Sequence, residues 1–457
     1  MLIDRPTAAL ASAPRLTPVP RPSRAQLAWQ REELAMFVHL GMNTFTGREW
    51  GEGTEDPAIF DPQHLDARQW ARTAHEAGFG TLVLTAKHHD GFCLWPSATT
   101  SHTVAASPWR GGSGDVVREA AEACAAEGIR FGIYCSPWDR NAPSYGSGRG
   151  YDDLYIAQLT ELLTGYGDVA EVWFDGAVGE TARGRQSYDW DRIFGTVRAL
   201  QPDAVIFSDA GPDVRWVGNE DGVAGATCWS SIDPARVPTP GRSDPWSLDS
   251  LRSGDPDGQV WRPAETDVSI RPGWFWHEHE NGSVLDGGAL LDLYLASVGR
   301  NSKLLLNVPP NRDGLLERTD VAALRSFARL REEVLGTDLL AGATISEDRG
   351  ALVITPPAPV VADLVTLAED IEQGQHVAAF RLQVEVAEDE AAADGERWRP
   401  LTSGTTIGHL RALRFPPIGV RRLRLVVDLT YGPARVRSVS LHRDARGEHR
   451  RRADSHD

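Results

Sequence analysis

The chain has 457 residues, a formal net charge of −17 at pH 7 and 41% apolar residues. At about 100–200 residues per domain, this length predicts two or three domains, or one barrel with an additional module. The excess of acidic side chains argues against a nucleic-acid partner, which would require a basic face. No run of about 18 apolar residues occurs, so we expect neither a transmembrane helix nor a membrane partner. The sequence carries no signal for an oligomeric state.

The cysteines and the N-terminal segment bear on where the protein works. Cys93, Cys124, Cys135 and Cys228 form no CxxC pair and lie in apolar or strand-like stretches. This pattern predicts reduced thiols and favours the cytoplasm over a secreted location. The first 24 residues are rich in proline and lack the apolar run of a signal peptide. We therefore predict a cytoplasmic protein whose residues 1–27 form a flexible segment.

Short apolar runs alternate with helical patterns from about residue 30 to 340. The predicted strands are apolar throughout, as parallel strands buried on both faces are, and lie at 36–40, 81–85, 130–134, 170–174, 204–207 and 302–308. The predicted helices lie at 66–77, 115–127, 152–163, 190–200 and 320–333. The later units, from about residue 216 to 279, are less regular.

Repeated strand–helix units predict either an open doubly wound sheet or a (β/α)8 barrel. No G-x-G-x-x-G follows the first strand, which weakens the case for a dinucleotide-binding sheet. A barrel has its active site at the carboxyl ends of its strands. Polar and aromatic residues gather there: His39, Lys87 to Asp90, Tyr134, Asp175 and Asp209. The sequence therefore predicts an α/β protein with a (β/α)8-like TIM barrel at residues 28–340.

The pattern of the sequence changes from alternating strands and helices to strands alone after about residue 341. Strand-like segments at 351–354, 378–384 and 422–427 are separated by turn residues, and helical periods are rare. This pattern predicts a C-terminal β-sandwich at residues 341–445. The charged end of the chain, residues 446–457, is predicted to be disordered.

Asp175 ends an apolar strand and precedes Gly176. Such an Asp can cap a following helix or present a carboxylate at the barrel mouth. Trp173 lies two positions earlier and therefore points to the same side of the strand. An aromatic floor beside an exposed carboxylate suits a sugar ring better than a helix cap, because a flat ring matches the C–H face of a pyranose.

A retaining glycosidase needs a second carboxyl group about 5–5.5 Å from the first. The best candidate is Glu220, in a loop that Gly218 and Gly222 delimit and in which Trp216 offers apolar surroundings that raise a carboxyl pKa. A solvated loop acid is the alternative interpretation. Glu265, in the segment from Trp261 to Glu265, is the competing acid.

Two adjacent histidines, His88 and His89, follow the second predicted strand, and His39 follows the first. Neighbouring residues of a strand point to opposite faces, so both ligating one metal ion is awkward, and no HExxH motif occurs. They are interpreted as donors to ring hydroxyls or as structural histidines. Glu49 and Trp50 follow in a polar loop, where a carboxylate can accept from hydroxyls while an indole stacks beneath a ring.

Several segments, in order along the chain, together resemble glycoside hydrolase family 29, the α-L-fucosidases. The resemblance spans about residues 28–335. It is carried by residues 39–45 (HLGMNTF), 49–51 (EWG), 85–92 (TAKHHDGF), 95–97 (WPS), 134–138 (YCSPW), 173–176 (WFDG) and 304–310 (LLLNVPP).

The resemblance implies a barrel with irregular later units and a retaining double-displacement mechanism without metal or other cofactor. It implies that Asp175 is the nucleophile. It also implies that a fucosylated oligosaccharide is the substrate. Residues expected to contact fucose are His39, Glu49, Trp50, His88, His89, Tyr134 and Trp173.

The segments 215–222, 263–265 and 269–274 look like the branch of this family that prefers α-1,3/1,4-linked fucose in Lewis-type glycans. In that branch Glu220 corresponds to the acid/base. Arg215, Arg271 and Trp274 belong to these segments and are expected to contact substrate. The C-terminal sandwich is similar to discoidin-like, or galactose-binding-like, modules. Phe37 with Trp274 and Trp276 is a candidate pocket for the methyl group of fucose.

Other hypotheses remain open. The barrel could bind sugar without cleaving it, although both carboxylates are present. A metal-dependent hydrolase or deacetylase could be built around His88, His89 and Asp90. A glycosidase could act on another deoxy sugar or on an α-L-galactoside. The C-terminal module could bind glycans or only brace the barrel.

Overall fold

The computed structural model describes all residues except 4–6, 14, 16–17, 242–243, 386–396 and 447–457. Of the predicted disordered tail, 446–457, only Arg446 lies within the described residues. In the described part of the chain, no helix has the length and apolar character needed to cross a membrane.

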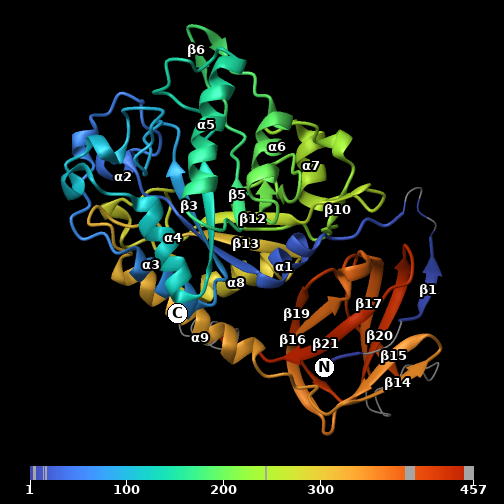
Figure 1. Ribbon diagram of the computed structural model, residues 1–457. Helices are drawn as coiled ribbons and strands as arrows, with labels where there is room; N and C mark the ends of the chain where they lie inside the picture. The colour runs from blue at the N-terminus through green and yellow to red at the C-terminus, as the bar shows by residue number, and fades with distance from the viewer. Residues whose placement is uncertain (4–6, 14, 16–17, 242–243, 386–396, 447–457) are drawn as a thin grey trace.

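Eight parallel strands form the sheet at the centre of the larger domain (Figure 1). In chain order they are β2 (Leu34–Val38), β3 (Thr81–Lys87), β4 (Arg130–Cys135), β5 (Glu171–Trp173), β8 (Val205–Phe207), β9 (Arg215–Trp216), β12 (Ala264–Ser269) and β13 (Ser302–Asn307). Consecutive strands pair except for β8 and β9, and β13 pairs with β2. A single parallel bridge, from Phe207 to Val214, joins β8 to the approach to β9. The sheet is therefore a nearly closed barrel, as predicted.

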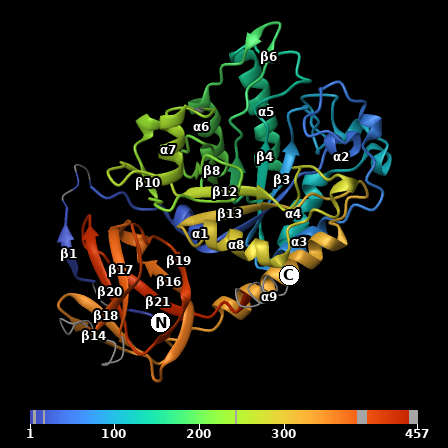
Figure 2. The same ribbon diagram turned by 180° about the vertical axis from the view of Figure 1, so that it is seen from behind.

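Helices cover the outside and the amino end of this barrel (Figures 1 and 2). They are α1 (Arg24–Glu32), α2 (Met42–Thr46), α3 (Ala67–Ala77), α4 (Val116–Glu127), α5 (Arg149–Gly165), α6 (Trp190–Leu200), α7 (Pro245–Ser253), α8 (Gly287–Ser297) and α9 (Arg318–Leu335). Two small antiparallel two-stranded sheets lie in the connections. One is the hairpin of β6 (Glu180–Thr181) and β7 (Gly184–Arg185), and the other pairs β10 (Ser231–Ile232) with β11 (Val260–Trp261) across α7.

Local sequence explains where the helices begin and end. Asp66, Asp115, Asp189 and Asp286 each accept a backbone N–H at the start of α3, α4, α6 and α8, which satisfies donors that the helix leaves unpaired. Helices α3 and α4 end at Gly78 and Gly128, with φ of 85° and 72°, a conformation that glycine adopts without a Cβ penalty. The predicted helices are confirmed to within three residues at each end.

The strands β9 and β12 were not predicted, because they are short or polar. Residues 208–214, which join β8 to β9, contain no helix. In β12, Glu265, Asp267 and Ser269 alternate with Thr266 and Val268. Successive side chains of a strand point to opposite faces, so the three polar residues point into the barrel at three successive levels.

The C-terminal domain consists of two packed sheets that share a hydrophobic core. One contains β14 (Thr344–Asp348), β15 (Ala351–Thr355), β20 (Leu423–Thr430), β17 (Val377–Glu385) and β18 (Trp398–Gly404). The other contains β19 (Arg411–Val420), β16 (Val360–Glu369) and β21 (Val436–His442). Apart from the added β1 described below, their strands pair antiparallel, and the predicted sandwich architecture is present.

The N-terminal segment differs from the expected flexible chain. Residues Ala9–Ser12 form β1, which runs parallel to β20 and pairs with residues 427–430. The neighbouring strand β15 pairs with residues 423–425 only, so β1 covers the part of β20 that β15 leaves open. Figure 1 shows this blue strand beside the orange and red strands of the sandwich. Pairing an otherwise open edge outweighs the cost of ordering the segment.

The sandwich docks on the barrel through a buried hydrogen-bond network centred on Asn301. Its amide group donates to the Cys228 carbonyl at 2.9 Å and to Gln375 at 3.2 Å, and its amide oxygen accepts from the His409 N–H at 2.7 Å. At the same interface, His409 contacts Glu33 at 3.0 Å. The turns of the sandwich around residues 375 and 409 are therefore packed against the barrel.

We expect Asn301→Ala to lower the free energy of unfolding by about 3 kcal/mol, because it leaves several buried polar groups unpaired. Asn301 also has φ of +66°, which Asn tolerates better than Ala. Urea denaturation measures the change. Asn281→Ala, which removes one hydrogen bond to Arg271 at a half-buried position, is the control and should cost less than half as much. Equal losses would contradict the role of Asn301 as the centre of the interface.

Candidate functional site

A cavity of about 150 Å³ opens at the carboxyl ends of the barrel strands. Nine of the twelve residues expected at the site line this cavity. The other three lining residues are Phe37, Ala177 and Asp267. The lining consists of Phe37, His39, Trp50, His88, His89, Tyr134, Trp173, Asp175, Ala177, Glu220, Asp267 and Trp274. Residues distant in sequence therefore meet because strands β2, β3, β4, β5 and β12 end at one edge of the barrel.

Asp175 is held in a fixed orientation directly after β5. The Tyr134 hydroxyl donates to its Oδ2 at 3.1 Å, and the Ala177 N–H donates to its Oδ1 at 2.7 Å. The His89 Nε2 atom lies 3.8 Å from Oδ2. Asp175 does not cap a helix, because the next helix, α6, is capped by Asp189. Its side chain is 28% exposed, so a ligand in the cavity can reach the carboxylate.

Three neutral histidines line the cavity together with this carboxylate. Burial lowers the pKa of His39 to about 3, and burial also lowers the pKa values of His88 and His89. Neutral imidazole has one donor and one acceptor nitrogen, and the neighbour of one nitrogen decides the role of the other. The three rings can therefore offer a mixed set of donors and acceptors, as the hydroxyl groups of a sugar require.

The neighbours of the histidines indicate which nitrogen carries the proton. His39 Nδ1 lies 2.8 Å from the Asn307 carbonyl oxygen, and Asn307 uses its amide nitrogen to donate to Ser269 and Trp274. His39 Nδ1–H is thus the donor, and Nε2 is left as an acceptor. His88 Nδ1 lies 3.3 Å from the Asn43 amide nitrogen, a donor, so Nε2 of His88 carries the proton. These assignments follow from the hydrogen-bond network.

Glu220 lies at the rim of the cavity in the loop after β9. Burial raises its pKa, nearby Asp175 and Asp221 raise it further, and a hydrogen bond from Trp274 opposes them. A carboxyl group with a raised pKa is suited to donate a proton. Gly218 and Gly222, with φ of 87° and 71°, form the turns that bring Glu220 over the end of β12.

Asp267 is a lining residue that sequence analysis missed. It is buried in β12, and its Oδ1 accepts from the Trp216 indole at 2.8 Å. Burial and the proximity of Glu220 raise the pKa of Asp267 to about 8, so this carboxyl group is largely protonated at neutral pH. The alternation of Glu265, Asp267 and Ser269 is the available signal, but Asp267 falls between the segments 263–265 and 269–274 that the sequence analysis considered.

Trp173 forms the floor of the cavity. It stacks on Phe207 with ring centres 4.2 Å apart, and its indole N–H donates to Glu265 at 2.9 Å. Glu265 is fully buried below the floor and hydrogen-bonds Glu171. Burial first, and repulsion from Glu171 second, raise the pKa of Glu265 well above its usual range. Glu265 therefore lacks access to the cavity, which favours Glu220 as the acid.

Three residues expected to contact substrate, Glu49, Arg215 and Arg271, do not line this cavity. Glu49 accepts from the Trp274 N–H at 2.8 Å and contacts His277 Nε2 at 2.7 Å, so it anchors the loop that carries Trp274. Arg215 is fully buried and donates to the Leu251 and Trp229 carbonyl oxygens. Arg271 forms a buried bidentate ion pair with Asp320.

Two further candidates also lie outside the lining. Asp209 accepts from the Gly241 N–H at 2.7 Å, and Trp276 is buried. Within the described ranges, no group of three or more His, Cys, Asp or Glu side chains could hold a metal ion. His88 contacts Asn43, His89 Nδ1 lies 2.7 Å from the Ser136 hydroxyl, and Asp90 accepts from the Phe92 N–H at 2.8 Å.

Comparisons with known proteins agree with this geometry. The family model for α-L-fucosidases matches residues 29–331. Alpha-L-fucosidase 1 of Arabidopsis thaliana is 42% identical over 93% of this chain and 88% of its own length. A glycoside hydrolase 29 family member from an unknown rumen bacterium has a TM-score of 0.86 at 39% identity, covering 94% of this chain and 78% of that one. A Ruminococcus gnavus family 29 fucosidase in complex with fucose has a TM-score of 0.82 at 30% identity, over 96% and 98% of the two chains.

The raised pKa of Asp267, about 8, predicts a pH dependence of stability. Between about pH 4, where the unfolded chain releases the proton, and pH 8, folding takes up a proton, so stability falls as pH rises. The variant Asp267→Asn has no carboxyl group at this position, so this fall in stability with rising pH does not occur in it. Its free energy of unfolding relative to wild type should increase from pH 5 to pH 8, by at most about 1.4 kcal/mol per pH unit.

Urea denaturation at pH 5, 6.5 and 8 measures this difference. Asp249→Asn, at an exposed position of α7, is the control and should show no such trend. If Asp267→Asn and Asp249→Asn have the same pH dependence, Asp267 is not the buried proton carrier.

Proposed function

Because the chain belongs to the α-L-fucosidase family, glycoside hydrolase family 29, and is an α-L-fucosidase, we propose that it removes terminal α-1,3- and α-1,4-linked L-fucose from oligosaccharides or glycoconjugates with retention of configuration. The observation that carries this proposal is the meeting of Asp175 and Glu220 on one cavity of about 150 Å³. One carboxylate is oriented by two hydrogen bonds, and the other carboxyl group has a raised pKa. Retaining glycosidases need these two roles.

The proposed reaction has two steps. Asp175 attacks the anomeric carbon while protonated Glu220 donates its proton to the departing oxygen, and a covalent glycosyl-enzyme forms. Glu220, now ionised, then takes a proton from water as the water oxygen attacks the same carbon. Fucose leaves with its original configuration, and Asp175 is free again.

The proposed fucose contacts follow from the chemistry of the lining. Neutral His39, His88 and His89 supply donors and acceptors for ring hydroxyls, and Trp173 supplies a flat apolar surface. Phe37 and Trp274, whose ring centres are 6.4 Å apart, offer an apolar place for the C5 methyl group. The R. gnavus fucosidase solved with fucose supports a fucosylated substrate for this chain as well.

Two further proposals concern the protein as a whole. We infer that it works in the cytoplasm, which is supported by four free and buried cysteines. We also infer that the C-terminal sandwich braces the barrel rather than binding glycans. Support comes from the turns that carry Gln375 and His409, which contact Asn301 and Glu33 of the barrel and are not open to solvent.

Asp175→Asn keeps the shape of the nucleophile but removes its negative charge. We expect it to lower kcat on 4-nitrophenyl α-L-fucoside by more than about 10³-fold, because loss of a residue that forms the covalent intermediate removes the main path. A steady-state assay of the purified protein measures this. Asp191→Asn, on the exposed start of α6, is the control. Wild-type turnover by Asp175→Asn would refute the proposed nucleophile.

Glu220→Ala should lower kcat on Lewis-type trisaccharides by about 10²–10⁴-fold, as expected for loss of a general acid. Added azide should restore part of the turnover on the nitrophenyl fucoside, because a small anion can occupy the vacated space and attack the glycosyl-enzyme. Glu265→Ala is the matched comparison, and azide should not rescue it. Rescue of Glu265→Ala instead would transfer the acid/base role. Activity on the nitrophenyl fucoside with none on the trisaccharides would contradict the proposed linkage preference.

A further inference from the structure

A second cavity, of about 730 Å³, lies next to the first and shares Glu220 with it. Its walls come from the loop after β9, the end of β12, the loop that follows it and one side of α8. The first cavity is about five times smaller. Glu220 is the one described residue that lines both cavities, so it stands at the boundary between them.

The alternation of β12 explains why the two cavities are adjacent. Asp267 and Val268 are consecutive, and neighbouring side chains of a strand point to opposite faces. Asp267 lines the first cavity inside the barrel, and Val268 lines the second on the outer side. Gly222 packs so closely against Val268 that an added Cβ would lie 2.7 Å from its Cγ1 atom. The loop that carries Glu220 therefore sits directly over the end of this strand.

The lining of the second cavity has the chemistry of a sugar-binding surface. Val268, Leu285 and Leu293 provide apolar surface, while Ser283 and Asp221 provide hydroxyl and carboxylate groups at the exposed margin. Sugars present C–H faces and hydroxyl groups together, so a mixed lining of this kind suits them. Arg271 also lines this cavity, but its charge is paired with Asp320. The carboxyl groups of Glu220 and Asp221 therefore make the lining acidic, which disfavours a negatively charged ligand.

We propose that this second cavity is the leaving-group subsite, which holds the neutral glycan to which the fucose is attached. The inference rests on the proposed function, because it takes Glu220 as the acid. The glycosidic oxygen must lie within reach of the proton that Glu220 donates. With fucose in the smaller cavity, the rest of the substrate therefore extends past Glu220, where the larger cavity begins. The ligand class is a neutral oligosaccharide that fills the space along α8.

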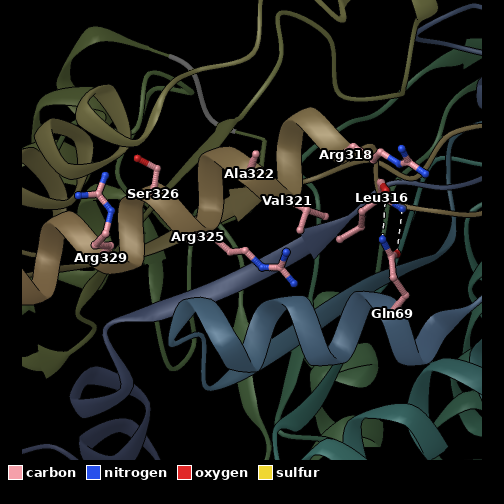
Figure 3. Close-up of a pocket in the computed structure, with 8 residues that line it drawn as sticks. All are labelled: Gln69, Leu316, Arg318, Val321, Ala322, Arg325, Ser326 and Arg329. Atoms are coloured by element: carbon pink, nitrogen blue, oxygen red, sulfur yellow. Dashed lines mark hydrogen bonds between the residues drawn. The ribbon is translucent and has the colours of Figure 1, made fainter.

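A third cavity provides an internal comparison. It has about 750 Å³, nearly the same volume, and lies between α3 and α9 (Figure 3). Gln69 and Leu316 close one end through two hydrogen bonds, of 3.0 and 3.1 Å. Figure 3 shows Ala322 of α9 among its lining residues. None of the residues that line it lines either of the other two cavities, so volume alone does not identify a subsite.

The test fills each cavity with a large side chain at a matched helix position. Ala289→Trp narrows the second cavity from α8, and Ala322→Trp narrows the third from α9. Ser283→Trp narrows the second from an exposed loop residue, where the change is less able to disturb folding. Circular dichroism and thermal unfolding establish that each variant is folded.

Two substrates separate the subsites. α-L-Fucosyl fluoride has a single atom as its leaving group, whereas a neutral Lewis-type trisaccharide has two further sugars. We expect Ala289→Trp and Ser283→Trp to lower the ratio of kcat/KM on the trisaccharide to kcat/KM on the fluoride by about tenfold or more, through KM, a loss typical of a removed binding contact. Ala322→Trp should leave the ratio as in wild type.

The outcomes distinguish this inference from the function on which it rests. If both folded variants of the second cavity keep the wild-type ratio, the leaving group binds elsewhere and the inference fails, while hydrolysis of the fluoride still supports the fucosidase. If the wild-type protein does not hydrolyse the fluoride, the proposed function fails first. An equal drop for Ala322→Trp would show a general effect of added bulk and would also overturn the inference. A wild-type preference for a sialylated over the neutral glycan would contradict the neutral ligand class.

Discussion

The active-site floor depends on one hydrogen bond to a charged layer in the closed interior of the barrel. The Trp173 indole donates to Glu265 at 2.9 Å, and Glu265 hydrogen-bonds Glu171 below it. Two buried carboxyl groups this close cannot both be charged, so Glu265, whose pKa burial and Glu171 raise, holds a proton. Lys303 lies 4.0 Å from Glu171 and 3.0 Å from Glu32, so its positive charge is shared between these two carboxyl groups. Trp173 is thus fixed from below, and Asp175 follows it two residues later on the same face of the chain.

The two proposed catalytic carboxyl groups are supported in different ways. Asp175 follows a buried strand and is oriented by Tyr134 and the Ala177 N–H. Glu220 lies in a loop, where its support passes through Trp274 to Glu49. Glu49 is therefore linked to Glu220 through the loop that carries Trp274.

Much of the barrel could be predicted from local sequence because its first five strands are short apolar runs, and the helices α3, α4 and α6 between them begin at Asp caps. The same pattern placed His39, His88, His89, Tyr134 and Asp175 at strand ends, and the closure of the barrel brings them together. The protein partners of the charged residues could not be predicted in this way. Arg215 donates to two backbone carbonyl oxygens, and Arg271 forms an ion pair with Asp320. These partners are distant in sequence, and no local pattern indicates them.

Strand β12 shows why the remaining part of the site could not be predicted from the sequence. Strands inside a barrel are expected to be apolar, so a polar segment does not predict such a strand. Each inward side chain of β12 nevertheless has its own hydrogen-bond partner. Glu265 pairs with Trp173, Asp267 with Trp216 and Ser269 with Asn307. Such pairing removes the penalty for burying polar groups. It also gives the strand two functional faces, because Asp267 borders the smaller cavity while Val268 borders the larger one. A strand with an apolar interior face could not have combined these roles.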